Sequence, residues 1–498
     1  MSSYCLRKAT WEDAGLLHKW ANDKDTRENS FHPKEISWDE HSLWFKKCLN
    51  NRDIDLYICY RDEHAVGQVR LNCDNVTGVI SYSIASEARG QGVGSEIIRL
   101  IELKVKETRP QLTRLTGDVK PDNLASRRIF EKNGYRQETV DMPQMHYRYV
   151  KEMARRPAIG LRVDANSHIA TGHMMRCLSI AAAISKTGAA CVFFVADRDA
   201  AAFAHEGGHA CVVLNSRWDD LEPEAGPLLD ALQERGIAKL LVDTYCATPA
   251  YLNQLRAGAK VIYIDDLNAC RWPADMLINY NIYSDQFDYP RLYQDTGTQL
   301  LLGCEYAPLR DEFSGLAPAA RDSVKKVLVT TGGTDPHNTA GVLLGQIYER
   351  GLFAEIEFHV IAGRLSAHAD SLRLLAGKRP GFVVHTDVRR MAELMQSCDL
   401  AVTAGGSTLY ELCACGLPAV TLSFADNQLY AVKTFDGQGL MPYAGDMRED
   451  AAACVEAVLF HLEALINDPA RRRQAADSIR LRVDGKGAER IAAAIAAL

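Results

Sequence analysis

The sequence predicts an α/β protein in which an N-terminal α+β domain precedes two doubly wound, parallel-sheet domains. The chain has 498 residues, which is more than one hydrophobic core ordinarily holds. Hydrophobic residues make up 47% of it and charged residues 24%, as in ordinary globular proteins. Apolar, strand-like runs alternate with helix-length segments over most of the chain, which indicates repeated βαβ units.

The first 150 residues have a pattern of their own. Apolar runs predict strands over residues 56–60, 65–71 and 78–85, and a glycine-rich turn and an amphipathic helix follow the last strand directly. Residues 151–158 then form a short polar segment with a proline, which is typical of a domain boundary. We therefore expect a first domain over residues 1–150.

Two series of apolar strands follow this boundary. The first series covers residues 159–163, 191–195, 239–242, 261–264 and 276–278, and the second covers 324–329, 356–361, 382–384, 400–402 and 419–422. Residues 307–323, which are rich in proline, alanine and charge, separate the two series. Because helix-length segments connect the strands, we predict two parallel-sheet domains over residues 159–310 and 322–498, with a cleft between them.

Charge and composition exclude several classes of function. The formal net charge of −7, without long basic runs, argues against nucleic acid or an anionic membrane as the main partner. No stretch approaches the roughly 18 apolar residues of a membrane span, and the N-terminus lacks the apolar core of a signal peptide. The fourteen cysteines have no CxxC spacing, which predicts thiols in a cytoplasmic protein. The sequence thus favours an enzyme that acts on a small-molecule substrate, and it leaves the oligomeric state open.

A glycine-rich loop opens the long helix of the first domain. Its sequence is Arg89-Gly-Gln-Gly-Val-Gly94, and the free N–H groups of the next helical turn suit an anion such as a pyrophosphate. Together with the segment Asn123-Leu-Ala-Ser-Arg-Arg-Ile-Phe-Glu-Lys-Asn-Gly-Tyr135, the loop resembles the GCN5-related N-acetyltransferases (GNAT), over nearly all of residues 1–150. The resemblance implies acetyl-CoA as co-substrate, held by Arg89, Gly90, Gln91, Gly92, Val93, Gly94 and Asn123.

The proton donor of this domain departs from the pattern of the family it resembles. Much of that family has a tyrosine before the Glu-Lys pair, where this chain has Phe130. Acetyl transfer needs a proton for the departing thiolate, so Tyr82 and Tyr135 are substitutes to test, and Ser83 is a candidate base through water. Each of the three could instead be an ordinary packing or surface residue, and the domain could be a degenerate ligand-binding module.

Polar residues follow six predicted strands of the second half of the chain. They begin at Asp164, Asp243, Asp265, Thr330, Thr403 and Ser423. The carboxyl ends of parallel strands lie at one edge of a sheet, where open α/β sheets bind ligands. Asp265 and Asp266 could pair around a cation, but one sugar contact and one cap is the simpler interpretation, so we predict no metal site.

The glycines of residues 330–335 and 403–408 precede predicted helices and suit a nucleotide-sugar better than NAD or ATP, because neither dinucleotide nor P-loop spacing is present.

His173 is the candidate general base of this half. It follows Gly172 at a predicted helix start, where the helix dipole favours a neutral imidazole. The alternative is a histidine that only caps the helix, and His168 is a weaker candidate for the base. Asp164 and Asn166 are predicted to hold the substrate or the histidine, unless they only cap the turn.

The motifs RVDANSHIATGHMMRCLSIA, LLVDTY, YIDDL, TTGGTD, AGGSTLYE and FADNQ, in this order, resemble the UDP-sugar hydrolases of pseudaminic acid synthesis, over residues 159 to about 450. That resemblance implies a GT-B-like pair of domains, a water activated by His173, and release of UDP with inversion. It implies substrate contacts from Glu411 to the ribose, from Gly405, Gly406 and Ser407 to the diphosphate, and from Asn427 and Gln428 to the sugar or phosphate. Further predicted substrate-binding residues are Arg162, Gly172, Arg176, Asp243, Tyr245, Asp265, Gly332, Gly333 and Thr334.

Taken together, the two resemblances imply a bifunctional enzyme. The first domain would acetylate the 4-amino group of a UDP-sugar, and the second half would hydrolyse the UDP-2,4-diacetamido-2,4,6-trideoxy-hexose that results. A GT-B glycosyltransferase with an appended acetyltransferase, and a non-catalytic nucleotide-binding scaffold, are the alternatives.

Overall fold

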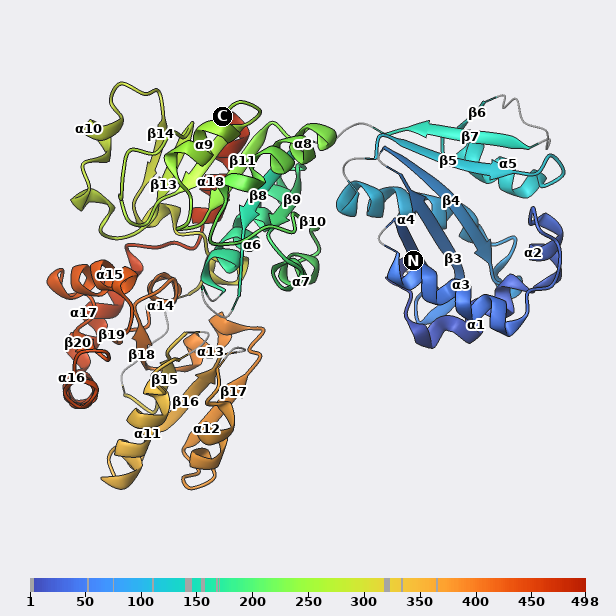
Figure 1. Cartoon of the computed structure of the whole chain (residues 1–498). Coiled ribbons are helices and arrows are strands. Elements are labelled where there is room, and N and C mark those ends of the chain that lie inside the picture. The colour runs from blue at the N-terminus through green and yellow to red at the C-terminus, as the bar shows by residue number, and fades with distance from the viewer. Residues whose placement is uncertain are drawn as a thin grey trace. The chain divides into compact units, whose positions relative to one another are not determined.

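The computed structural model describes residues 4–51, 53–74, 76–109, 112–138, 146–153, 157–166, 169, 171–317, 323–332, 335–363 and 366–498. The chain divides into two compact units, with the break between Ala158 and Ile159 (Figure 1). Each unit has a hydrophobic core of its own.

The first unit is built on one seven-stranded sheet. In spatial order its strands are β1 (Tyr4–Lys8), β2 (Ile54–Arg61), β3 (His64–Cys73), β4 (Thr77–Ile84), β5 (Arg114–Val119), β7 (Tyr147–Glu152) and β6 (Arg136–Glu138). Neighbouring strands are antiparallel except β4 and β5, which are parallel.

The pairing of β4 with β5 is short. Only Thr77–Val79 of β4 pair with Arg114–Thr116 of β5, although β4 continues to Ile84. The rest of β4 therefore lacks a partner strand on that side within the described part of the unit, and a ligand can reach its backbone there.

Helices cover both faces of this sheet. They are η1 (Trp11–Asp13), α1 (Ala14–Ala21), α2 (Lys24–Asn29), α3 (Trp38–Asn50), η2 (Ser86–Ala88), α4 (Val93–Thr108) and α5 (Leu124–Lys132). Helix α4 is amphipathic and buries Ile97, Ile98 and Ile101 against the sheet. Ser37 and Glu40 form a capping box that fixes the start of α3.

The second unit contains two parallel sheets. The first has the strand order β10 (Ala210–Val213), β9 (Ala190–Val195), β8 (Ala158–Val163), β11 (Lys239–Asp243), β12 (Lys260–Ile264), β13 (Met276–Asn279) and β14 (Gln299–Leu302). The second has the order β17 (Phe382–Thr386), β16 (Glu357–Ala362), β15 (Lys326–Thr330), β18 (Leu400–Ala404), β19 (Ala419–Ser423) and β20 (Tyr443–Asp446). In each sheet the chain first adds strands toward one edge and then returns to the middle and adds strands toward the other edge. This switch falls between β8 and β11 in the first sheet and between β15 and β18 in the second, as in Rossmann-like sheets.

Helices connect these parallel strands. Those of the first sheet are α6 (Gly172–Lys186), α7 (Arg198–Glu206), η3 (Glu222–Glu224), α8 (Ala225–Arg235), α9 (Pro249–Leu255), η4 (Ser284–Gln286), α10 (Tyr289–Tyr293), η5 (Cys304–Tyr306) and η6 (Asp311–Phe313). Those of the second sheet are α11 (Thr339–Glu349), α12 (Ala369–Ala376), α13 (Met391–Ser397), α14 (Thr408–Cys415), α15 (Asp426–Gly437), α16 (Ala451–Asn467) and α17 (Pro469–Arg480).

The last helix, α18 (Gly487–Ala497), returns to the first sheet of the second unit. It packs on α6, and Lys239 Nζ of β11 donates hydrogen bonds to the carbonyls of Ile495 (2.7 Å) and Ala496 (2.9 Å) at its C-terminal end. Ile491 and Ile495 belong to a core cluster that contains side chains from both sheets. The predicted fold class, an α+β domain followed by two doubly wound parallel domains, is confirmed.

Candidate active sites

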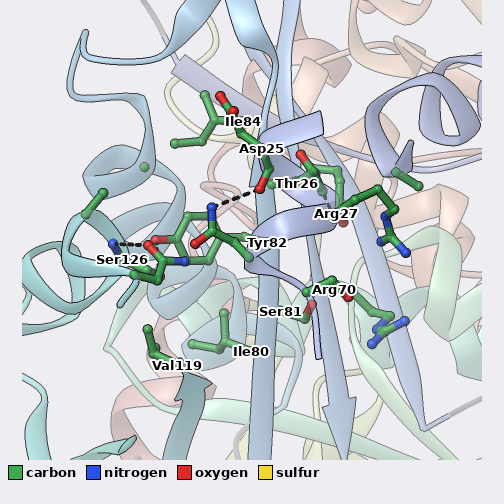
Figure 2. A pocket seen from close by; sticks show the side chains of 18 of the residues that line it. Asp25, Thr26, Arg27, Arg70, Ile80, Ser81, Tyr82, Ile84, Val119 and Ser126 are labelled. Carbon is green, nitrogen blue, oxygen red and sulfur yellow. Dashed lines mark hydrogen bonds between the residues drawn. The ribbon is translucent and has the colours of Figure 1, made fainter. Parts of the chain in front are cut away.

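A large cavity opens in the first unit where β4 and β5 separate. Its volume is about 1270 Å³, which exceeds the roughly 300–1,000 Å³ typical of one small-molecule pocket. Helices α1 to α3, strands β3 and β4, the loop before α4 and helix α5 contribute its lining (Figure 2). The cavity is therefore large enough for two ligands that meet along β4.

The glycine-rich loop forms one part of this lining. Gly90 and Gly92 have φ values of +73° and +80°, which favour glycine, and open space surrounds the position of a Cβ at each. Gly92 is the N-cap of α4. Gly94 has another role, because a Cβ there would lie 2.6 Å from Ile129 and 2.9 Å from Ile84. The loop thus leaves its backbone accessible at the helix N-terminus, where an anion binds favourably.

The predicted polar contacts of this loop have protein partners in the structure. Arg89 lines the cavity and pairs with Asp23 and with Asp25 (2.6 Å). Asn123 also lines the cavity and caps α5 by accepting a hydrogen bond from the Ser126 N–H (3.0 Å). Val93, which is buried, belongs to the lining as well.

Gln91 is the one predicted loop residue outside the lining. Its Nε2 donates to the Glu87 carbonyl (2.9 Å), and its Oε1 accepts from Arg61 (2.6 Å). It orders the loop through these two bonds.

Tyr82 is the tyrosine that reaches the cavity. Its hydroxyl is hydrogen-bonded to the Ser126 hydroxyl (2.8 Å), and burial raises the pKa of Tyr82 to about 12. Ser83 also lines the cavity and accepts a hydrogen bond from Gln68 Nε2 (3.2 Å). Tyr135 is buried against Phe130, with the ring centroids 5.0 Å apart, and does not line the cavity.

In the second unit, His173 forms a buried dyad with Asp243. His173 Nδ1 lies 2.8 Å from Asp243 Oδ1, and Arg176 donates to both oxygens of the same carboxylate (2.6 and 2.5 Å). Burial disfavours the Asp243 charge, but Arg176 and His173 outweigh it and hold the pKa of Asp243 well below its ordinary range. Asp243 is 1% exposed, so it orients the imidazole and does not reach a ligand itself.

Further polar residues surround this dyad. Arg176 donates to Asp266 (2.9 Å) and to the Tyr280 hydroxyl (2.8 Å), and Tyr245 donates to the same carboxylate of Asp266 (2.8 Å). The Tyr245 ring stands edge-on to His173 with centroids 4.6 Å apart. The side chain of Asn427, on α15 of the second sheet, acts on the Tyr245 hydroxyl and opposes the rise that burial causes in its pKa. The predicted residues His173, Tyr245 and Asn427 therefore gather where the loops of both sheets meet.

Four further predicted site residues have partners within the protein. Arg162 is fully buried and pairs with Glu224 and Asp164 (2.5 Å each). The other oxygen of Asp164 accepts from the Ala196 N–H (2.7 Å), which occupies that carboxylate within the protein.

Asn166 and Asp265 are the other two. Asn166 Oδ1 accepts from the Ile169 N–H (3.0 Å) and fixes the turn, which was the alternative role for this residue. Asp265 accepts from the N–H groups of Leu267 (3.1 Å) and Asn268 (2.9 Å) and from the Tyr289 hydroxyl. Its neighbour Asp266 is the member of the pair that reaches the His173 site. His168 lies outside the described residues.

The glycines of the second sheet differ in accessibility. Gly405 is buried, and a Cβ there would lie 2.6 Å from Val432, whereas Gly406 and Ser407 are exposed at the start of α14. Helix α14 has no side-chain cap, and its Leu409 and Tyr410 N–H groups donate to the carbonyls of Gly406 and Ser407 (3.0 Å each). The N–H groups of Gly406 and Ser407 themselves are therefore the ones placed to meet an anion. Gln428 folds back and accepts from the Phe424 N–H (3.0 Å).

Helix α11 follows the first strand of the same sheet, and the N–H groups at its start already have an acceptor within the protein. The Asp335 carboxylate accepts hydrogen bonds from the N–H groups of Thr339 (2.8 Å) and Ala340 (3.1 Å). Gly332 before it has a φ value of +86°, and Gly333 and Thr334 lie outside the described residues. The start of α14 is therefore the better anion site of the two.

Glu411, the predicted ribose contact, lies one turn into α14. Arg310, in the connection between the two sheets, donates to it (3.3 Å). Burial raises the pKa of Glu411, and Arg310 opposes that rise. Gly172 opens α6, and a Cβ there would meet no atom of the described residues within 4 Å.

Within the described ranges, three or more His, Cys, Asp or Glu side chains are nowhere gathered as a metal site. No helix in the described part of the chain combines the length and apolar character that crossing a membrane requires. All fourteen cysteines are present as thiols.

Sequence reasoning missed two groups of residues. Asp266 was visible only as one of two adjacent carboxylates, and the sequence did not say which one turns toward Arg176. Gln68, Arg70 and Asn72 alternate with apolar residues along β3, a pattern that reads as an ordinary solvated strand face. Three long polar side chains on one face, opposite a helix, were the available signal.

The Acetyltransferase (GNAT) domain model matches residues 4–136, so the first unit carries a GNAT domain. A spermidine N-acetyltransferase from Vibrio cholerae, solved in complex with CoA and spermine, is 16% identical over 30% of this chain and 96% of its own, with a TM-score of 0.29. Because that score is low, the assignment rests on the family model and the topology of the unit.

Two curated relatives match over longer ranges. The spore coat polysaccharide biosynthesis protein SpsG of Bacillus subtilis is 25% identical over 340 residues, which are 67% of this chain and 96% of that protein. The pseudaminic acid cytidylyltransferase and UDP-2,4-diacetamido-2,4,6-trideoxy-beta-L-altropyranose hydrolase of Helicobacter pylori is 25% identical over 205 residues, which are 40% of this chain and 37% of that protein. The chain is thus similar to both and spans little more than a third of the second.

Proposed function

We propose that the chain is a bifunctional nucleotide-sugar enzyme of pseudaminic acid biosynthesis. The first unit transfers an acetyl group from acetyl-CoA to a UDP-4-amino-4,6-dideoxy sugar. The second unit, with residues 159–310 and 322–498 as its two halves, hydrolyses the UDP-2,4-diacetamido-2,4,6-trideoxy-hexose. The observation that carries the proposal is the His173–Asp243 dyad at the reversal point of the first sheet, beside Asn427 of the second. Similarity to the Helicobacter pylori hydrolase supports the substrate.

In the hydrolytic step, Asp243 accepts the Nδ1–H of His173 and so leaves Nε2 as the base. Nε2 takes a proton from water as the water oxygen bonds to the anomeric carbon from the face opposite the diphosphate. The glycosidic C–O bond breaks, and its electron pair leaves with UDP. The free sugar therefore has the inverted anomeric configuration.

The second sheet supplies the UDP contacts. Gly406 and Ser407 at the start of α14 offer N–H groups to the diphosphate, and Gly405 lets Val432 of α15 pack closely against this loop. Glu411 accepts hydrogen bonds from the ribose hydroxyls, while Arg310 holds the Glu411 carboxylate in place. Asn427 and Gln428 face the sugar or a phosphate from α15.

In the acetyl-transfer step, the amine nitrogen attacks the thioester carbonyl carbon. The C–S bond breaks, and Tyr82, whose raised pKa keeps it protonated until the thiolate forms, gives that thiolate its proton. Ser83 relays the proton that the amine loses to water. The N–H groups at the start of α4 hold the pyrophosphate of acetyl-CoA.

Isotope incorporation tests the hydrolase directly. In ¹⁸O-labelled water, C–O cleavage places the label in the sugar, and proton NMR of the first product reports inversion. Label in UDP, or a retained anomer, would contradict the proposed step.

A glycosyltransferase is the second candidate, because SpsG is named as a spore coat polysaccharide biosynthesis protein. Such an enzyme would release no UDP from the UDP-sugar until an acceptor is added. The thiol state of the fourteen cysteines favours the cytoplasm, where both nucleotide co-substrates occur.

A further inference from the structure

One wall of the acetyltransferase cavity is polar and is not explained by acetyl-CoA. Gln68, Arg70 and Asn72 lie at alternate positions of β3, so their side chains share one face of the sheet. In the antiparallel ladder they pair with Ser83, Ser81 and Val79 of β4. Arg27 of α2 and His41 of α3 line the same cavity. We call these five residues, Arg27, His41, Gln68, Arg70 and Asn72, the polar wall.

Each residue of the polar wall has a buried polar atom without a hydrogen-bond partner among the described residues. These atoms are Arg27 Nε, His41 Nε2, Gln68 Oε1, Arg70 Nε and Asn72 Oδ1. Buried polar groups are ordinarily hydrogen-bonded, so five such atoms in one wall indicate a polar ligand that satisfies them.

The wall is also positively charged. Arg70 has no carboxylate partner within the described part of the unit, and its guanidinium lies over the Trp44 ring at 5.4 Å. Among the described residues, the Arg27 side chain donates to two backbone carbonyls, those of His32 (3.0 Å) and Lys34 (3.3 Å). Burial lowers the pKa of both arginines, because neither charge is compensated by a nearby anion.

The carboxylates that line the cavity are mostly engaged elsewhere. Asp25 pairs with Arg89, Asp118 pairs with Arg148, and Glu40 belongs to the capping box of α3. Glu35, the remaining one, is exposed. A cationic acceptor such as a polyamine would meet two unpaired arginines, whereas an anionic acceptor would neutralise them.

We propose that the polar wall binds the phosphate-bearing part of the acetyl acceptor, with the guanidinium groups of Arg27 and Arg70 as its main contacts. Figure 2 shows both side chains extending in the same direction, on the opposite side of the view from Tyr82 and Ser126. The amine would thus lie toward Tyr82 while the phosphate lies toward Arg70. This inference rests on the proposed acetyltransferase function and specifies its substrate class as a phosphate-linked amino sugar.

Steady-state kinetics of the full chain test the proposal. In Arg70→Gln, the KM for a UDP-4-amino sugar is expected to rise at least about tenfold, because charge-assisted hydrogen bonds to phosphate are lost. The KM for acetyl-CoA and the kcat/KM for the same amino sugar without UDP should stay as in the unmodified protein. Asn72→Asp, which places a carboxylate beside Arg70, should give the same pattern. Arg99→Gln, at an exposed arginine of α4, is the matched control and should change nothing.

Several results would overturn the inference. They are an unchanged KM for the UDP-amino sugar, an equal loss with both acceptors, or a rise in the KM for acetyl-CoA. Thermal unfolding of each variant separates a folding defect from lost recognition, and Arg70→Lys, which keeps the charge, should recover part of the affinity.

Failure of the proposed function can be told apart from failure of this inference. If the unmodified protein does not acetylate a UDP-amino sugar, the function fails, and calorimetry with inorganic pyrophosphate in saturating CoA decides on the wall. One binding site fewer in Arg70→Gln than in the unmodified chain would support the wall. Equal stoichiometry would contradict it.

Discussion

At the scale of single residues, the proposed hydrolysis depends on His173. The change His173→Ala removes the base and should lower UDP release by about 10²- to 10⁴-fold. UDP binding should persist, because its proposed contacts lie in the second sheet. Single-turnover UDP release and equilibrium UDP binding measure the two effects.

A second histidine of the same sheet gives the control. His205→Ala, at an exposed position of α7, should leave turnover unchanged. Equal turnover in His173→Ala and His205→Ala would move the base elsewhere.

Asp243 is the second residue whose change has a defined outcome. Asp243→Asn removes the acceptor that fixes the His173 tautomer, so kcat should fall by about 10²- to 10⁴-fold with little change in KM. Because Arg176 then lies buried with one anion fewer, the free energy of unfolding should fall by about 3–5 kcal/mol. Kinetics and denaturant unfolding of the same sample check both.

The loss of unfolding free energy in Asp243→Asn should depend on pH in one direction. The pKa of Asp243 is lowered in the folded state, so its stabilisation is full above pH about 5 and declines as the pH falls below the ordinary Asp value of about 4. The difference between the two proteins in the free energy of unfolding should therefore shrink in acid. A difference that grows in acid would contradict the assignment.

Residue types at strand ends were predictable, but their partners were not. The sequence placed Asp164, Asp243 and Asp265 after strands; Asp164 and Asp265 do follow β8 and β12, and Asp243 is the last residue of β11. It could not show that Arg162 and Arg176, from the same segment, pair with different carboxylates. Those pairings depend on which strands become neighbours, and that order is a tertiary property.

At the scale of elements, long apolar runs predicted strands correctly, whereas short strands at the sheet edges were not predicted. The central strands β8, β11, β15 and β18 were all predicted, because strands buried on both faces read as continuous apolar runs. The edge strands β10, β14 and β20 were missed, because they are short and mostly only partly buried, whereas β13, which is as short but buried throughout, was predicted. The role of α18 was also missed, because its contacts lie far away in the sequence.

Helix α18 should stabilise the first sheet of the second unit. Ile491→Ala removes a fully buried side chain from the shared core and should cost about 2–5 kcal/mol in the free energy of unfolding. Leu481→Ala, at a side chain that is 88% exposed, should cost less than about 0.5 kcal/mol. Denaturant unfolding compares the two, and equal costs would mean that α18 does not pack as described.

At the scale of the whole molecule, the proposal places two activities in one chain, which raises the question of substrate transfer. A tether can raise the local concentration of the intermediate. If it does, the intact chain should form the final sugar with a shorter lag than an equimolar mixture of residues 1–158 and 159–498. Time courses at limiting intermediate measure this, and identical courses would leave no case for transfer.

A single incubation tests the proposed activities of both units together. Mass spectrometry of a UDP-4-amino sugar incubated with acetyl-CoA and the full chain should show a gain of one acetyl group, followed by UDP and a free diacetamido sugar. The second step should be absent in His173→Ala while the first persists. An unchanged UDP-amino sugar, or an acetylated UDP-sugar that the unmodified protein never cleaves, would contradict the account.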